Sequence, residues 1–141
     1  MADFITHFSC LLDVGTPDNA ARALALYQAF MEETARDDVP SDGILLSIQP
    51  EHGATQLWTR DDATGNPQQV IDFVLRCAEA FELKGRWGFQ WANTCSRPRV
   101  NAFGGGAHLL DLATRETLTR TDTSGWLART LAPPRGKRDA R

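Results

Sequence analysis

The sequence predicts an α+β fold, in which a mainly antiparallel sheet carries two long helices on one face. Two observations predict it. Short segments with alternating apolar residues are typical of strands, and two longer segments carry apolar residues at helical spacing. The predicted order is β-α-β-β-α-β-β-β-α, whose first six elements match the split β-α-β pattern of ferredoxin-like folds. Because unrelated functions share this pattern, the fold alone indicates no function.

The first strand and the first helix follow from alternation and from capping. Residues 4–12 carry apolar side chains on both faces, which predicts a central strand rather than an exposed edge. Thr16 is the predicted N-cap and Pro17 the first residue of a helix that runs to about Arg36. Its apolar residues at helical spacing are Ala20, Ala23, Leu24, Tyr27, Phe30 and Met31.

A hairpin and a second helix follow. Strands are predicted at 44–49 and 54–60, with a tight connection between them. Asn66 and Pro67 repeat the capping pattern at the start of a helix that runs to about Leu83. The residues that this helix is expected to bury are Val70, Phe73, Val74, Cys77 and Phe81.

Three more strands and a short helix complete the predicted fold. The strands are expected at 87–92, 107–112 and 116–121, the last two as a hairpin. Thr123 or Ser124 is the expected cap of the short helix, which holds Trp126 and Leu127. We expect a single domain over residues 1–131 and a flexible basic tail over 132–141, because the tail is rich in proline and has nothing apolar to bury.

Residues 93–106 form a predicted loop that is the candidate functional segment. It holds a cysteine, two arginines around a proline, and three consecutive glycines. A loop of this length in a compact domain is usually functional or disordered. From Leu83 to Leu110 there is no Asp or Glu, whereas Lys84, Arg86, Arg97 and Arg99 are positive. Residues 83–110 are therefore a positively charged stretch in a chain whose net charge is negative.

Composition limits the class of protein. The 42% hydrophobic and 23% charged residues are ordinary for a soluble globular chain. No apolar run reaches the roughly 20 residues that cross a bilayer, and the N-terminus lacks a signal-peptide pattern. The three cysteines Cys10, Cys77 and Cys95 include no CxxC pair, which argues against a disulfide framework. These features predict a cytoplasmic protein without membrane association.

The glycine run at 104–106 has two interpretations. Consecutive glycines permit positive φ, and their N–H groups can form an anion-binding nest. The structural alternative is a bulge or a tight entry into the following strand. The run matches neither a phosphate loop nor a dinucleotide fingerprint. We expect Gly105 or Gly106 to hold a positive φ.

The arginines and the nearby aromatic residues also have two interpretations. Arg97 and Arg99 flank a proline in an extended stretch, near the alternating residues Trp87, Phe89 and Trp91. Basic and aromatic residues together are typical of a nucleic-acid or phosphate surface. In the structural alternative, the aromatic side chains pack into the core and the arginines are solvated or paired with carboxylates of the body. We expect the arginines to be exposed.

A catalytic site is a further hypothesis. Cys95 is a possible nucleophile, activated by the arginines and by His108, with Asn93 or Asp111 in support. The sequence shows no signature of a cysteine enzyme and no recognised spacing of zinc ligands. We therefore assign no catalytic residue, metal ligand or cofactor. The candidate binding residues are Asn93, Cys95, Arg97, Arg99, Gly104, Gly105, Gly106 and His108.

Two stretches carry a resemblance to a known group of proteins. Residues 91–99 read Trp-Ala-Asn-Thr-Cys-Ser-Arg-Pro-Arg, residues 103–107 read Phe-Gly-Gly-Gly-Ala, and a Trp-Leu pair stands at 126–127. Over about the last third of the chain, this pattern resembles a family of small phage and mobile-element proteins. The resemblance implies a phage or mobile-element origin, and it carries no activity and no site residue.

Three functional hypotheses remain. The first is a non-enzymatic accessory protein of a phage or mobile element that binds a macromolecular partner, with an anti-defence inhibitor such as an anti-CRISPR as its specific form. The second is a nucleotide- or nucleic-acid-binding module that uses Arg97, Arg99 and the glycines. The third is an enzyme built around Cys95. The expected partner is a host or phage protein, and nucleic acid is the alternative.

Overall fold

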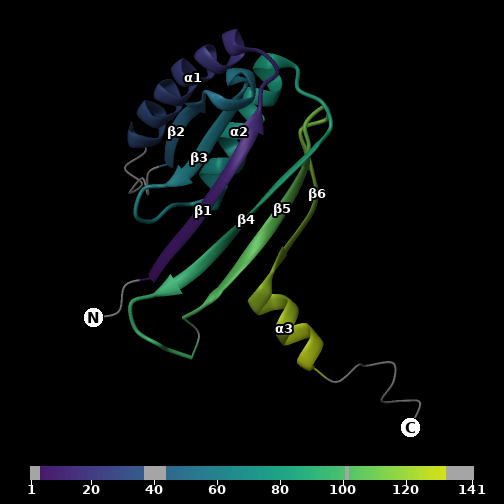
Figure 1. Cartoon of the computed structure of the whole chain (residues 1–141). Helices are drawn as coiled ribbons and strands as arrows, with labels where there is room; N and C mark the ends of the chain where they lie inside the picture. Colours follow the sequence, from purple (N-terminus) through teal and green to yellow (C-terminus); the bar gives the residue numbers. More distant parts are fainter. Residues whose placement is uncertain (1–3, 37–43, 101, 133–141) are drawn as a thin grey trace, which may run out of the picture.

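The computed structural model describes residues 4–36, 44–100 and 102–132, and it confirms the α+β fold (Figure 1). Most of the predicted tail, residues 133–141, lies outside the described residues. In chain order the elements are β1 (Phe4–Asp13), α1 (Pro17–Arg36), β2 (Ile44–Gln49), the 3-10 helix η1 (Glu51–Ala54), β3 (Gln56–Asp61), α2 (Pro67–Phe81), β4 (Arg86–Cys95), β5 (Gly104–Asp111), β6 (Glu116–Asp122) and α3 (Thr123–Leu131).

The six strands form one antiparallel sheet with the order β2-β3-β1-β4-β5-β6. The first four strands have the ferredoxin-like arrangement, and β5 and β6 extend the sheet beyond β4. β1 lies at the centre, as its apolar residues predict. Its first half pairs with β4, from Phe4 to Phe8, and its second half pairs with β3, from Ser9 to Asp13. The sheet therefore has two parts, β2-β3 and β4-β5-β6, which are joined through β1.

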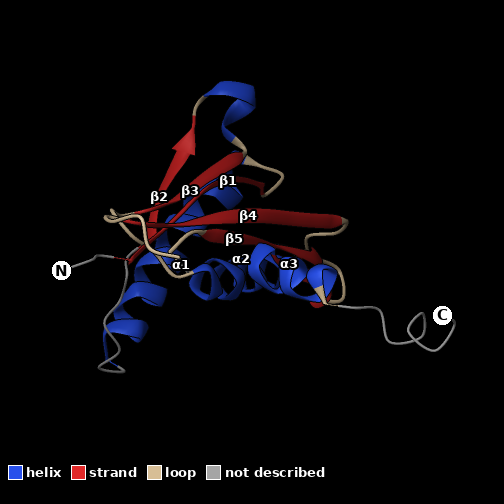
Figure 2. Ribbon diagram, turned by 90° about the horizontal axis from the view of Figure 1, so that it is seen from below, coloured by secondary structure: helices blue, strands red, loops and turns tan. Residues whose placement is uncertain are grey.

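The three helices lie on the same side of the sheet, but they do not cover it evenly. Figure 2 shows α1, α2 and α3 on one side of the strands. In Figure 1, α1 and α2 cover one end of the sheet, while α3 lies at the other end, where it follows β6. None of the described helices is long and apolar enough to span a membrane.

Capping residues fix where the long helices begin. The Oγ1 atom of Thr16 accepts a hydrogen bond of 3.0 Å from the N–H of Asn19, and Oδ1 of Asn66 accepts one of 2.9 Å from Gln68. Both predicted caps are therefore confirmed. α2 ends two residues earlier than predicted, because Glu82 adopts a left-handed conformation with φ 52°.

The predicted cap of α3 is wrong. Asp122, not Thr123 or Ser124, is the N-cap, and its Oδ1 accepts a hydrogen bond of 2.5 Å from the N–H of Gly125. The strand β6 continues through Asp122, so the helix starts directly where the strand ends. A second difference is the connection between β2 and β3, which is the 3-10 helix η1 rather than a tight turn.

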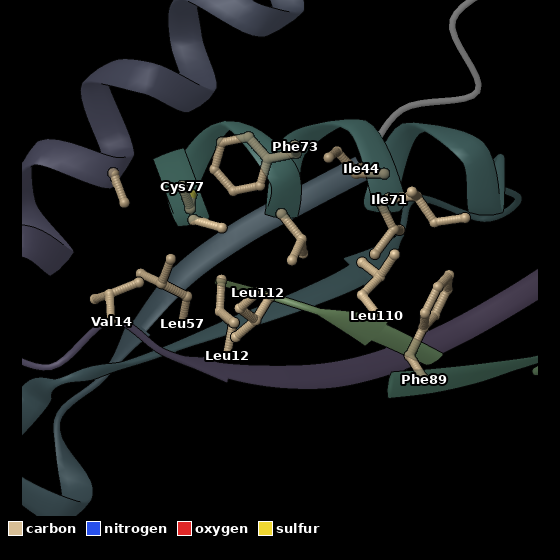
Figure 3. Close-up of a cluster of buried hydrophobic side chains, with 14 of the residues drawn as sticks. Leu12, Val14, Ile44, Leu57, Ile71, Phe73, Cys77, Phe89, Leu110 and Leu112 are labelled. Carbon is tan, nitrogen blue, oxygen red and sulfur yellow. The ribbon is translucent and has the colours of Figure 1, made fainter. Parts of the chain in front are cut away.

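The core lies between α1, α2 and the covered end of the sheet (Figure 3). Of the side chains that its spacing predicts, α2 buries Val70, Phe73, Val74 and Cys77, whereas Phe81 is only half-buried against the core. The strands supply Phe8, Leu12, Leu57, Phe89 and Leu110. Cys77 is fully buried as expected, whereas Cys10 is only half-buried. Burial raises the pKa of each of these two thiols to about 12.

The aromatic residues of β4 belong to this packing. Phe89 is buried, and the half-buried rings of Trp87 and Trp91 contact it on either side with centroid distances of 5.4 Å. Phe8 meets Phe89 edge to face at 6.3 Å. The structural alternative is thus confirmed for these rings, which are used inside the fold rather than as an open stacking surface.

Candidate binding surface

The predicted loop is shorter than the sequence indicates. β4 continues to Cys95 and β5 begins at Gly104, so that the irregular segment is 96–103 rather than 93–106. The correction has a physical reason. Asn93 pairs with Thr6 of β1 on one side and with Gly104 of β5 on the other, so its backbone lies within the sheet despite its low strand propensity.

The described part of this loop turns tightly, and all of its side chains except that of Ala102 are exposed. The N–H of Arg99 donates a hydrogen bond of 2.9 Å to the carbonyl of Arg97, which closes a three-residue turn around Pro98. The buried Ala102 anchors the loop, and its N–H donates to the carbonyl of Arg99 at 3.2 Å. Arg97 and Arg99 are exposed, which confirms that prediction.

Large apolar side chains are exposed beside the two arginines. Val100 is 100% exposed, Phe103 is 56% exposed, and Phe4, which opposes Cys95 at the start of β1, is 64% exposed. We call Phe4, Arg97, Arg99, Val100 and Phe103 the loop surface. It lies at the end of the sheet that α1 and α2 leave uncovered (Figure 1).

A pocket of about 200 Å³ adjoins the loop surface. Its lining comes from β1, β4, the loop and α3: Phe4, Ile5, Thr6, Asn93, Thr94, Ala102, Phe103 and Ser124. Asn93 is fixed in this pocket because its Oδ1 accepts a hydrogen bond of 3.0 Å from the hydroxyl of Thr6. The hydroxyl of Thr123 donates to the carbonyl of Gly105 at 3.3 Å, which holds the start of α3 against β5.

The glycine run is part of β5, and the expectation of a positive φ is wrong. Among the described glycines, only Gly15, Gly53 and Gly85 have positive φ. Gly105 instead permits close approach, since an ideal Cβ there would lie 2.4 Å from the carbonyl oxygen of Trp91. A Cβ on Gly106 would lie 2.3 Å from Cζ2 of the same indole. These contacts support the tight entry into a strand, and a binding role for Gly104, Gly105 and Gly106 stays a prediction.

The groups proposed for catalysis are spread along the hairpin. Cys95 opposes Phe4 at one end of β4, whereas His108 opposes Phe89, six residues away along the strand. At a rise of about 3.3 Å per residue, the separation is roughly 20 Å. Asp111 lies farther still, opposite Arg86. The geometry therefore does not bring Cys95, His108 and Asp111 together.

His108 has a structural environment of its own. It is 5% exposed, and its Nε2 lies 2.9 Å from the hydroxyl of Thr117, while its Nδ1 has no hydrogen-bond partner among the described residues. Burial lowers the pKa of this imidazole, and the positive charge of Arg120 lowers it further. The folded protein therefore favours the neutral form of the His108 imidazole. In the described part of the chain, no group of three His, Cys, Asp or Glu side chains could hold a metal ion.

This environment predicts a loss of stability in mild acid. Because the pKa of His108 is lowered in the fold, the unfolded chain takes up a proton near pH 6.5 that the folded chain does not. The free energy of unfolding should therefore fall as the pH is lowered from 7.5 to 5.5. Urea titrations at both values test this. In His108→Gln the difference between the two values should shrink, and an unchanged difference would assign it to other groups.

The sequence alone did not indicate several residues of this surface. Phe4, Thr6 and Ser124 reach the loop surface or its adjoining pocket only through the pairing of β1 with β4 and the position of α3; Thr6 and Asn93, for example, are 87 residues apart in the sequence. No local motif marks such contacts. No family model, no curated protein and no solved structure matches the chain.

Proposed function

We propose that the chain is a non-enzymatic accessory protein of a phage or mobile element, and that it binds a macromolecular partner through the loop surface. The observation that carries the proposal is the composition of this surface. Two exposed guanidinium groups stand beside three large apolar side chains, of which Val100 is wholly exposed. Arginine and aromatic residues are enriched at protein interfaces, and an exposed apolar patch is a common mark of one.

The partner chemistry that fits this surface is a protein with an apolar patch bordered by carboxylates. Apolar contact with Phe4, Val100 and Phe103 would supply affinity, and charge complementarity with Arg97 and Arg99 would supply orientation and rate of association. The rings that could have stacked on nucleic-acid bases, Trp87, Phe89 and Trp91, pack on one another and on the core. This favours a protein partner over a nucleic acid.

The specific form that we would test first is inhibition of a host defence complex, as in an anti-CRISPR protein. The support is the resemblance of residues 91–99 and 103–107 to small phage and mobile-element proteins, together with the size of the chain. Capture of partners from a host lysate on the immobilised protein would identify the target. Recovery of a defence complex would support this form, and recovery of a different host or phage protein would leave only the broader binding function.

Reversing the two charges of the loop surface should weaken binding without unfolding the protein. Arg97→Glu/Arg99→Glu is expected to shift the melting temperature by no more than about 2 °C, because exposed charges contribute little to stability. Binding to the captured partner should weaken, and the loss should shrink as salt screens the charges. Calorimetry of the isolated proteins measures both effects.

The matched control is Lys84→Glu/Arg115→Glu, which makes the same change of charge at the opposite end of β4 and β5. Both side chains are exposed. This variant should bind the partner as the wild type does. If the two double variants lose affinity equally, the effect is one of net charge, and the loop surface is not the interface. If Arg97→Glu/Arg99→Glu unfolds, the arginines stabilise the fold.

The second candidate is a nucleic-acid-binding module, favoured by the exposed Arg97 and Arg99 in a stretch without any acidic residue. A single-stranded oligonucleotide of mixed sequence tests it by fluorescence anisotropy over a series of salt concentrations. Binding that weakens linearly with the logarithm of salt, and that Arg97→Glu/Arg99→Glu abolishes, would support this function. Absence of binding at low salt would exclude it.

A further inference from the structure

Trp58 is a large aromatic residue that neither the loop surface nor the core uses. Its neighbours in β3, Leu57 and Thr59, are buried, so the alternation of the strand places Trp58 on the opposite face of the sheet. Figure 2 shows α1, α2 and α3 on one side of the strands, and Trp58 belongs to the side that they leave uncovered. The indole is half-buried there without packing against the core. It is therefore available for a binding site on this face.

Two contacts fix the orientation of the indole. Its Nε1–H donates a hydrogen bond of 2.8 Å to Oγ of Ser9 on β1. The guanidinium group of Arg60 stacks on the ring, with its Cζ 3.9 Å from the ring centroid, and donates a hydrogen bond of 2.9 Å to the hydroxyl of Ser47. Because the ring is held before any ligand arrives, binding to it costs little conformational entropy.

A pocket of about 540 Å³ adjoins the indole. It is lined by Ser9, Cys10, Leu11, Gln49, Glu51, Gln56 and Trp58. Gln56 and Arg60 flank Trp58 on the same face of β3, and only Gln56 lines the pocket, so the pocket meets the side of the indole that Arg60 leaves free. The loop surface is distinct from this pocket, because it includes the start of β1 at Phe4.

The polar groups of the pocket are not used by the fold. Gln49 and Gln56 lie opposite each other in the register of β2 and β3, so both amides reach the pocket. Within the described part of the chain, neither these amides nor the carboxylate of Glu51 forms a hydrogen bond. An amide both donates and accepts hydrogen bonds, and a carboxylate accepts them. The pocket thus combines one flat apolar wall with unused donors and acceptors around it.

We propose that this pocket binds a neutral saccharide. The C–H groups on one side of a pyranose ring carry a small positive charge, and the face of an indole is electron-rich, so the two pack flat on each other. The hydroxyl groups at the rim of the sugar donate and accept hydrogen bonds, as the amides of Gln49 and Gln56 do, and they can donate to Glu51.

The charges of the pocket disfavour the other ligands of a tryptophan. The phosphate of a nucleotide would approach Glu51 in the lining and Asp13, which lies opposite Gln56 on β1. The guanidinium group of Arg60 lies on the far side of the indole. Sites for quaternary ammonium groups enclose the cation in a cage of aromatic rings, whereas Trp58 is the only aromatic residue that lines this pocket among the described residues.

NMR titration of the full chain with four neutral disaccharides tests the site: cellobiose, maltose, lactose and N,N′-diacetylchitobiose. At least one should shift the indole N–H signal of Trp58 and the side-chain amide signals of Gln49 and Gln56. We expect a dissociation constant of about 1–10 mM, as for one stacked ring and a few hydrogen bonds. Trp58→Ala should weaken this binding about tenfold or more. Gln49→Ala/Gln56→Ala should weaken it about tenfold while keeping the stacked ring, so the test stands even if Trp58→Ala unfolds.

Two matched controls remove the same groups elsewhere. Trp126→Ala deletes an indole that is 56% exposed on α3, and Gln90→Ala deletes an exposed amide from β4. Both variants should bind the disaccharide as the wild type does. The proposal is overturned if none of the four disaccharides shifts the Trp58 signal at about 50 mM. It is also overturned if binding survives in folded Trp58→Ala and in Gln49→Ala/Gln56→Ala, or if adenosine binds the pocket more tightly than every disaccharide, which would make it a site for a base.

Discussion

Replacing Gly106 by alanine should lower the free energy of unfolding by about 2–3 kcal/mol, a large effect for one added methyl group. An ideal Cβ at this position would lie 2.3 Å from Cζ2 and 2.7 Å from Cε2 of Trp91, and 2.8 Å from the carbonyl oxygen of Thr121. The indole and both neighbouring strands would have to move. Gly105→Ala should cost a similar amount, because its Cβ would lie 2.4 Å from the carbonyl oxygen of Trp91.

Gly104→Ala is the matched control in the same strand. Its Cβ would meet the hydroxyl of Ser124 at 3.1 Å and that of Thr123 at 3.4 Å, and both hydroxyls are the ends of side chains that can rotate. We expect a cost of less than about 1 kcal/mol, within the range of tolerated surface changes. Urea denaturation of the three single variants gives the comparison. Equal costs at all three glycines would contradict the close-approach explanation.

The chemistry of the two clashes differs, which allows a sharper test. Gly106 is opposed by the indole ring of Trp91, whereas Gly105 is opposed by the backbone of that residue. In a Trp91→Val background, the cost of Gly106→Ala should therefore fall, while the cost of Gly105→Ala should persist. A double-mutant cycle measures the coupling in each case. If Trp91→Val were coupled equally to Gly105→Ala and to Gly106→Ala, the added methyl groups would be moving β4 and β5 apart as a whole.

The order of the elements and the caps of the two long helices were predictable from the sequence, whereas the register of the strands was not. Capping by Thr16 and Asn66 depends on residues within one turn, so the sequence carries the whole signal. The glycine run did indicate a close approach of the backbone. The residue that approaches it, Trp91, is determined by the register of β4 on β5. The same register decides that Asn93 belongs to a strand and not to a loop.

Proximity in sequence is also a poor guide to the candidate catalytic groups. Cys95 and His108 are thirteen residues apart, and the catalytic hypothesis took His108 as the group that activates the Cys95 thiol. In a hairpin, however, residues equally far from the turn lie opposite each other, and Cys95 and His108 are not equally far from it. Exposure was easier to predict. Arg97 and Arg99 lack local acidic partners, and two guanidinium groups without partners stay in water.

The largest loss of stability is expected at Phe73, where alanine should cost about 3–5 kcal/mol. This side chain is 1% exposed and lies at the centre of the contact between the two long helices. Its ring meets that of Phe30 at 5.9 Å and that of Tyr27 at 6.1 Å, the latter edge to face. Alanine would remove both aromatic contacts and leave a cavity that these rings cannot close.

Phe103→Ala is the matched control, because the same side chain is removed where it is 56% exposed. Its expected cost is less than about 1 kcal/mol, and its expected effect is on binding of the partner. Urea denaturation and affinity measured on the same preparations separate the two roles. Phe73→Leu, which keeps most of the volume, should recover more than half of the loss at Phe73. If Phe103→Ala were as destabilising as Phe73→Ala, the loop surface would be part of the core, and the proposed interface would have to be abandoned.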